Sequence, residues 1–247
     1  LPAPESEHIS IHFPPNVVPK SLSMNSLTAK QKSILHRYFV NEILIGNMVF
    51  WFIGGKVLCS SYVESYISDS NVIPSSEKEV ALCVVWIGIA AGRFIGLMDQ
   101  IQLNKMGEGG IHSLVHNFIA WISTGLLGGF LMFIRENSPI AFWTSLVLYG
   151  LGNGPCVGYA YDLNNRLTLM SEKGMAIVMF GLNFGASIVP YVATLVWDYS
   201  NYDYHIFPLL VFISMSMPMP VLLITYIING VSEMKHPDKA TKTETII

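Results

Sequence analysis

Long apolar blocks recur along this chain, and they limit its possible folds more than any other feature of the sequence. The predominantly apolar blocks are residues 39–63, 80–101, 114–134, 139–161, 174–197 and 206–229. A helix needs about 20 such residues to cross the hydrocarbon core of a bilayer. Because lipid offers the backbone no hydrogen-bond partners, each block must be helical. The sequence therefore predicts an all-α membrane protein with six transmembrane helices.

Composition agrees with this prediction. Hydrophobic residues make up 51% of the 247 residues and charged residues only 13%, whereas a soluble domain carries about 25% charged residues. A soluble core would not need its apolar residues divided into blocks of one length. The three cysteines have neither metal-ligand spacing nor the even number of a disulfide framework. With no nucleophile–base pair and no nucleic-acid motif in view, we expect neither an enzyme, nor a bound cofactor, nor a nucleic-acid partner.

Lysine and arginine predict the orientation. Of the 14 Lys and Arg residues, eleven fall on the side that holds both chain ends, two on the other side, and Lys56 inside a span. Cytosolic segments carry the positive excess, so both termini are expected in the cytosol. We expect residues 1–38 to be a largely irregular cytosolic linker, residues 39–229 the six-helix bundle, and residues 230–247 a cytosolic tail. We expect the plasma membrane rather than an internal one.

Two basic residues within the spans are candidates for function, because a charge in hydrocarbon usually faces a cavity or a partner. Lys56 either extends to the outer interface, as long lysine side chains can, or faces a central cavity and pairs with Glu64 or with a solute. Arg93 is predicted near the cytosolic end of the second span. There it caps carbonyls or pairs with Asp99 beside a cytosolic gate.

Polar and aromatic side chains also share one face of the first span. Asn47, Trp51, Leu58 and Tyr62 follow i, i+4, i+11, i+15 spacing. Aromatic rings stack on the apolar face of a pyranose and amides bind its hydroxyl groups, so this face is a candidate sugar site. The alternative is a helix-packing stripe with interfacial aromatic residues.

Two asparagines and three prolines stand out in the later spans. Asn153 and Asn183 need hydrogen-bond partners in lipid, and they line either a cavity or a helix interface. Pro190 and the pair Pro218 and Pro220 are expected to kink their helices, as gating requires.

Several short motifs, in order, resemble the C-terminal half of a major facilitator superfamily transporter. They are residues 49–56 (VFWFIGGK), 92–94 (GRF), 149–155 (YGLGNGP) and 181–185 (GLNFG) followed by Pro190. The resemblance extends over about residues 38–230 and is similar in detail to the fucose-permease-like and sodium-dependent glucose transporter branch. An acidic residue commonly follows the glycine region of the first motif in that branch. Lys56 stands there instead, a departure from the pattern.

The resemblance implies two inverted three-helix repeats and transport by alternating access. It implies a small polar solute, a hexose first, with symport of Na⁺ or H⁺ left open. The partner is an N-terminal six-helix half or a second chain. The alternatives are a carrier of a non-sugar solute and a transport-inactive membrane scaffold. The predicted solute-binding residues are Asn47, Trp51, Lys56, Tyr62, Asn153 and Asn183, and the predicted gating or structural residues are Arg93, Asp99 and Pro190.

Overall fold

The computed structural model describes residues 29–105, 111–134, 138–168, 172–200 and 203–234, and everything described is helix or connection. Its helices are α1 (Ala29–Ser70), the short 3₁₀ helix η2 (Ser75–Glu77), α2 (Lys78–Lys105), α3 (Ile111–Ile134), α4 (Pro139–Leu167), α5 (Glu172–Tyr199), α6 (Ile206–Ser216) and α7 (Pro218–Met234). The chain divides into residues 1–36 and residues 37–247. The helix bundle described below belongs to the second unit.

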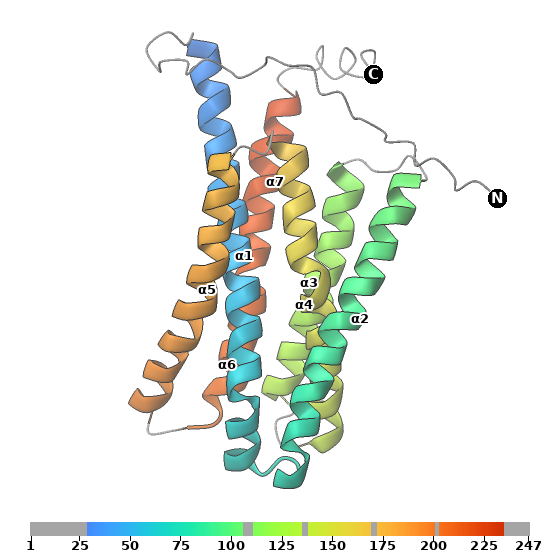
Figure 1. Ribbon diagram of the computed structural model, residues 1–247, viewed down its shortest axis with the longest axis vertical. Helices are drawn as coiled ribbons and strands as arrows, with labels where there is room; N and C mark the ends of the chain where they lie inside the picture. The colour runs from blue at the N-terminus through green and yellow to red at the C-terminus, as the bar shows by residue number, and fades with distance from the viewer. Residues whose placement is uncertain (1–28, 106–110, 135–137, 169–171, 201–202, 235–247) are drawn as a thin grey trace, which may run out of the picture. The chain divides into compact units, whose positions relative to one another are not determined.

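Within the described residues, five helices are long and apolar enough to cross a membrane. They are His36–Ser70, Ser75–Gln102, Ile111–Ile134, Gly174–Tyr199 and Ile206–Asn229. These confirm five of the predicted spans, and the fourth predicted span is the helix α4. Its polar residues include Asn153, Asp162, Asn164 and Arg166. It runs between the end of α3 and the start of α5, which lie at opposite ends of the bundle (Figure 1).

Local sequence explains several helix ends. Ser138 precedes α4 and its hydroxyl accepts a hydrogen bond from the Ala141 amide at 3.5 Å, with Pro139 in the first turn. At the end of α1, Asn71 has a φ of 53° and its amide donates to the Ile67 carbonyl. Asparagine tolerates this left-handed conformation better than most residues, so it ends the helix.

Small residues let the helices approach closely. A Cβ atom added at Gly88 of α2 would lie 3.2 Å from the Cα atom of Gly150 in α4. A Cβ atom added at Gly181 of α5 would lie 2.9 Å from the carbonyl carbon of Gly46 in α1. Glycine at these crossings allows backbone-to-backbone packing, the usual way in which membrane helices associate.

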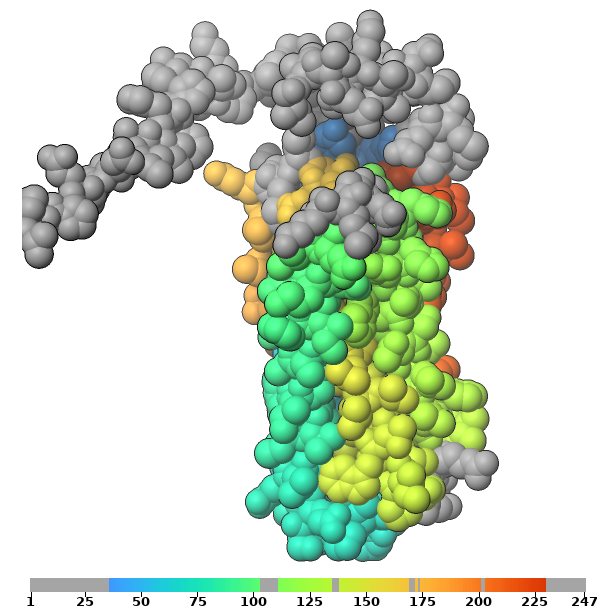
Figure 2. All heavy atoms as spheres, turned by 90° about the vertical axis from the view of Figure 1, so that its right-hand side faces the viewer, coloured from blue at the N-terminus to red at the C-terminus, as the bar shows by residue number. Residues whose placement is uncertain are grey.

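Large apolar side chains cover the outside of the bundle. Figure 2 shows the side on which α2, α3 and α4 lie next to one another. Exposed side chains on α2 include Ile87 and Phe94, and those on α5 include Phe180 and Tyr191. Soluble monomers rarely expose continuous apolar surface on this scale. The surface is suited to lipid or to another membrane protein.

Two boundaries differ from the predictions. The linker prediction is wrong for residues 29–38, because α1 begins at Ala29, where good helix formers follow the last proline of the segment. Residues 1–28 lie outside the described part of the chain, as do the tail residues 235–247; α7 continues to Met234. The break between α6 and α7 at Met217 confirms the interruption predicted at Pro218.

Candidate functional site

Lys56 lies deep in the bundle and contacts an aromatic ring. It is 14 residues from the end of α1 at Ser70, about 21 Å along the helix. Its ammonium group sits 4.6 Å from the ring centroid of Trp86 on α2, a cation–π contact. No ion pair joins it to Glu64 among the described residues. The side chain therefore turns toward Trp86 of the neighbouring helix, which lies eight residues after the start of α2.

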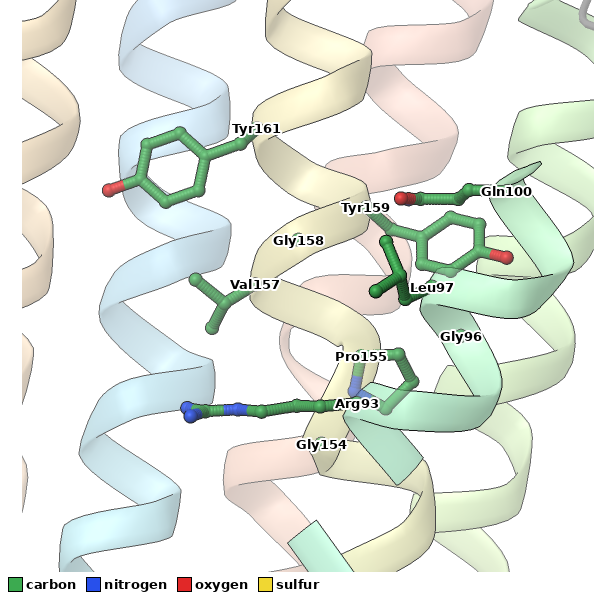
Figure 3. Close-up of a pocket in the computed structure, with 10 residues that line it drawn as sticks. All are labelled: Arg93, Gly96, Leu97, Gln100, Gly154, Pro155, Val157, Gly158, Tyr159 and Tyr161. Atoms are coloured by element: carbon green, nitrogen blue, oxygen red, sulfur yellow. The ribbon is translucent and has the colours of Figure 1, made fainter. Parts of the chain in front are cut away.

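Arg93 lies at nearly the same depth on α2, 15 residues after the helix begins at Lys78. Arg93 thus lies slightly past the middle of α2, toward the end at Lys105 that the sequence predicts to be cytosolic. Its side chain is exposed. It extends from α2 past Gly154 of α4 toward α1 (Figure 3). Among the described residues it has no hydrogen-bond or ion-pair partner.

A cavity of about 290 Å³ opens beside Arg93 between α2 and α4. Its lining includes Arg93, Gly96, Gln100, Gly154, Gly158 and Tyr161 (Figure 3). A Cβ atom added at Gly158 would meet nothing within 4 Å, so the absence of a side chain there leaves open space. Arginine, amide and phenol groups thus border a small hollow on an otherwise apolar face of the bundle.

Asp99 does not pair with Arg93. Its Oδ2 atom accepts hydrogen bonds from Asn117 of α3 at 3.3 Å and from the Tyr159 hydroxyl of α4 at 3.1 Å. The carboxylate therefore links three helices on a different face of α2. The predicted Arg93–Asp99 pair is absent because six residues of helix turn the two side chains about 120° apart.

The polar stripe of α1 does not form one site. Asn47 is exposed, whereas Trp51 is half-buried and packs edge-on to Phe50 at 5.2 Å. Nine residues separate Asn47 from Lys56, which places them on opposite faces of α1. The two therefore cannot line one cavity within this bundle.

Tyr62 lies at the far end of the same helix. Its hydroxyl binds Thr194 Oγ1 and donates to the Pro190 carbonyl at 3.3 Å, and its ring packs on Trp197 at 5.5 Å. It lines a separate pocket of about 420 Å³ that also contains Glu64. Tyr62 thus fastens α1 to α5 near Pro190, which lies within the continuous helix α5.

The two asparagines do not converge either. Asn153 is buried and donates to the Phe52 carbonyl at 3.2 Å and to Met215 Sδ at 3.3 Å, so it joins α4 to α1 and α6. Asn183 is exposed and donates to the Met179 carbonyl of its own helix at 2.9 Å. None of the predicted solute-binding residues, all of which lie in the described part of the chain, lines the cavity that Arg93 borders.

Sequence reasoning missed Trp86 and Gln100, although a signal was present. Trp86, Arg93 and Gln100 follow i, i+7, i+14 spacing and share one face of α2. A tryptophan, an arginine and a glutamine in one row on an otherwise apolar helix indicate a polar lining. Tyr161 has no comparable signal, because its contribution depends on how α4 packs against α2.

Taken together, the five spans and the apolar exterior define an α-helical integral membrane protein. No protein-family model, no curated protein and no solved structure matches the chain. The assignment to a class therefore depends on the fold and on the site alone.

Proposed function

We propose that this chain is a six-helix half of a secondary transporter that moves a small polar solute by alternating access. The observation that carries the proposal is a pair of basic residues at mid-depth on neighbouring helices, Lys56 on α1 and Arg93 on α2, of which Arg93 lines the α2–α4 cavity. A lysine or arginine at the centre of a membrane helix costs about 2.5–3.5 kcal/mol on insertion scales. Two such residues at one depth make the bundle less stable in the membrane, and a pathway for a polar solute would account for their presence.

A six-span arrangement supports the proposal. Helix α4 packs against both α2 and α3, and it returns the chain from the end of α3 to the start of α5. Its 29 residues are about 44 Å long, enough for a bilayer core of about 30 Å. We count α4 as a span whose polar residues face other helices. With six spans both chain ends lie on one side, which the lysine and arginine distribution assigns to the cytosol.

The helix contacts are consistent with an internal repeat of α1–α3 and α4–α7, taking α6 and α7 as one span. Helix α1 packs on α5 through Gly46 and Gly181, and α4 packs on α2 through Gly150 and Gly88. Likewise α1 binds α7 and α4 packs on α3. If α1, α2 and α3 are exchanged for their counterparts α4, α5 and α6–α7, the same pairs of helices remain in contact. Three spans per repeat invert the second copy, as in facilitator-type carriers.

The proposal leaves one side of the solute pathway to another bundle. Helices α2 and α5 both present exposed aromatic and aliphatic side chains, such as Phe94 and Phe184. In the facilitator fold a second six-helix half covers the corresponding surface. An N-terminal half or a second chain would therefore complete the site.

The solute class follows from the same residues. The hexose expectation depended on the α1 face that carries Asn47, Trp51 and Tyr62, and these side chains have separate surroundings. We therefore keep a small polar solute as the proposal, with a hexose as one member. Coupling to Na⁺ or H⁺ and the plasma membrane remain part of it as expectations.

Uptake by cells that express the full chain tests the proposal. A labelled panel of glucose, an anionic sugar and a dicarboxylate is offered at matched surface expression. Gly158→Trp fills the cavity and should abolish uptake. Leu127→Trp on the outer face of α3, where the side chain is exposed, is the matched control and should leave uptake intact. Equal uptake by cells with and without the chain would favour the transport-inactive scaffold.

A further inference from the structure

One basic side chain lies exposed on the surface of the bundle, far from both ends of its span. Arg93 is 15 residues from the start of α2 and 12 from its end, so it lies at least about 18 Å from either end. Among the described residues, its guanidinium group has neither a hydrogen-bond nor an ion-pair partner. That group stays charged and has five N–H donors. At membrane depth such a charge needs a partner, which has to come from outside the described bundle.

The surface beside Arg93 is hollowed where two helices separate. At Gly154 of α4 an added Cβ atom would lie 3.0 Å from the Arg93 amide nitrogen, so α4 and α2 are in close contact there. One turn further along α4, a Cβ atom added at Gly158 would meet nothing within 4 Å. The cavity of about 290 Å³ occupies this opening, and Arg93 lies at its Gly154 end (Figure 3). A side chain from a facing helix can therefore enter the hollow and reach the arginine.

The rim of this groove is suited to a membrane helix. Leu97 of α2 and Val157 of α4 line it, and the neighbouring Phe94 is 61% exposed. Lipid tails would cover these apolar side chains but would leave the charge of Arg93 unpaired. A helix with one carboxylate among apolar residues meets both requirements. Its apolar side chains pack on the rim, and its carboxylate takes paired hydrogen bonds from the arginine fork.

A second copy of this chain does not offer such a carboxylate. Two copies would share one orientation in the membrane, so the acidic residues that matter lie in the same half of the spans as Arg93. In the described part of the chain these are Glu42, Asp99 and Asp162. Asp99 accepts two hydrogen bonds within its own bundle, Asp162 pairs with Arg166, and Glu42 is only 5% exposed. The partner therefore differs in sequence from this chain.

We propose that the α2–α4 groove docks a transmembrane helix of the second six-helix half, and that a carboxylate at mid-depth on that helix pairs with Arg93. This inference rests on the part of the proposed function that leaves one side of the pathway to another bundle, and it specifies the chemistry of that bundle. Lys56 takes no part in the pair, because its ammonium group contacts the Trp86 ring.

The test uses a designed transmembrane helix as the probe. The full chain, fused to a donor fluorophore, is reconstituted in liposomes at pH 8 with an acceptor-labelled peptide of leucine and alanine that spans the bilayer. Three such peptides carry Asp, Asn or Leu at the central position, and energy transfer measures their binding. The Asp peptide should bind at least about fivefold more tightly than the Leu peptide, the gain expected for a polar contact between membrane helices.

Variants of the two mid-depth basic residues assign the effect. Arg93→Gln should remove the preference for the Asp peptide over the Asn peptide, because an amide carries no charge. Arg93→Lys keeps the charge without the planar fork and should retain part of the preference. Lys56→Gln is the matched control, since it removes the other mid-depth charge, and it should bind the Asp peptide like the natural chain. Unfolding temperatures measured without peptide identify any variant that fails to fold.

Two results would overturn the inference. If the Asp peptide binds no better than the Leu peptide, or if folded Arg93→Gln binds it unchanged, no carboxylate pairs with Arg93 in this groove. If the natural chain forms pairs without any peptide and Arg93→Gln abolishes them, a second copy occupies the groove instead. The uptake assay is independent of both. If cells show no uptake while the Asp peptide binds as expected, the transport proposal fails and the docking inference stands.

Discussion

The contact between α3 and α4 should be intolerant of even one added methyl group at Gly152. A Cβ atom at this position would lie 2.8 Å from the carbonyl oxygen of Trp121 and still closer to backbone atoms of Gly125. Non-bonded carbon atoms prefer separations of about 3.5–4.0 Å, so the two helices would have to move apart by about 1 Å. Backbone atoms cannot swing aside as a flexible side chain does.

Gly152→Ala should therefore destabilise the bundle. Overpacking of a close-packed interior costs about 1–3 kcal/mol, and rigid backbone on the opposite helix places this site at about 2–3 kcal/mol. For a chain of this size, each kcal/mol lowers the unfolding temperature by about 2–4 °C, so a fall of about 4–12 °C is expected. Thermal unfolding of the purified protein in one fixed detergent, followed by intrinsic tryptophan fluorescence, measures it.

Gly158→Ala is the matched control on the same helix. Its new methyl group would meet nothing within 4 Å, and alanine favours a helix over glycine by about 1 kcal/mol. The control should unfold at the natural temperature or slightly above it. If Gly152→Ala unfolds within about 1 °C of Gly158→Ala, the tight α3–α4 contact described here is wrong.

Three further predictions concern other parts of the bundle. Asn229→Leu should lower stability by about 1–3 kcal/mol in the same unfolding assay, because the side chains of Arg37 and Asn41 both donate to the Asn229 amide oxygen and would lose their acceptor. An unchanged unfolding temperature would show that this link between α1 and α7 contributes nothing. N-ethylmaleimide should modify Cys83 on the folded protein, and the two buried cysteines only after denaturation; mass spectrometry counts the adducts, and two or more on folded protein would contradict the burial. Pro190→Ala should raise the unfolding temperature by a few degrees, since a helix-interior proline costs up to about 3 kcal/mol. If Pro190 serves gating, the same variant should also slow uptake. Faster uptake would show that gating does not need Pro190.

Much of the fold was predictable from the sequence because a bilayer leaves few choices. Apolar segments of membrane-crossing length must be helices, and five of the six predicted spans meet that criterion within the described residues. The interruption at Pro218 was predictable for the same kind of local reason, the missing amide hydrogen of proline. The start of α1 at Ala29 was missed, because a polar segment with good helix formers carries no apolar periodicity.

The sequence by itself identified Lys56 and Arg93 as costly charges in apolar helices, since that judgement needs only the surrounding residues. Only the tertiary structure decided where they point. It separated Arg93 from Asp99, turned Asn47 away from Lys56, and used Asn153 to join three helices. It also brought Lys56 of α1 onto Trp86 of α2. Helical spacing determines which residues of one helix share a face, whereas the rotation of each helix about its axis depends on glycine contacts between helices, which no single segment encodes.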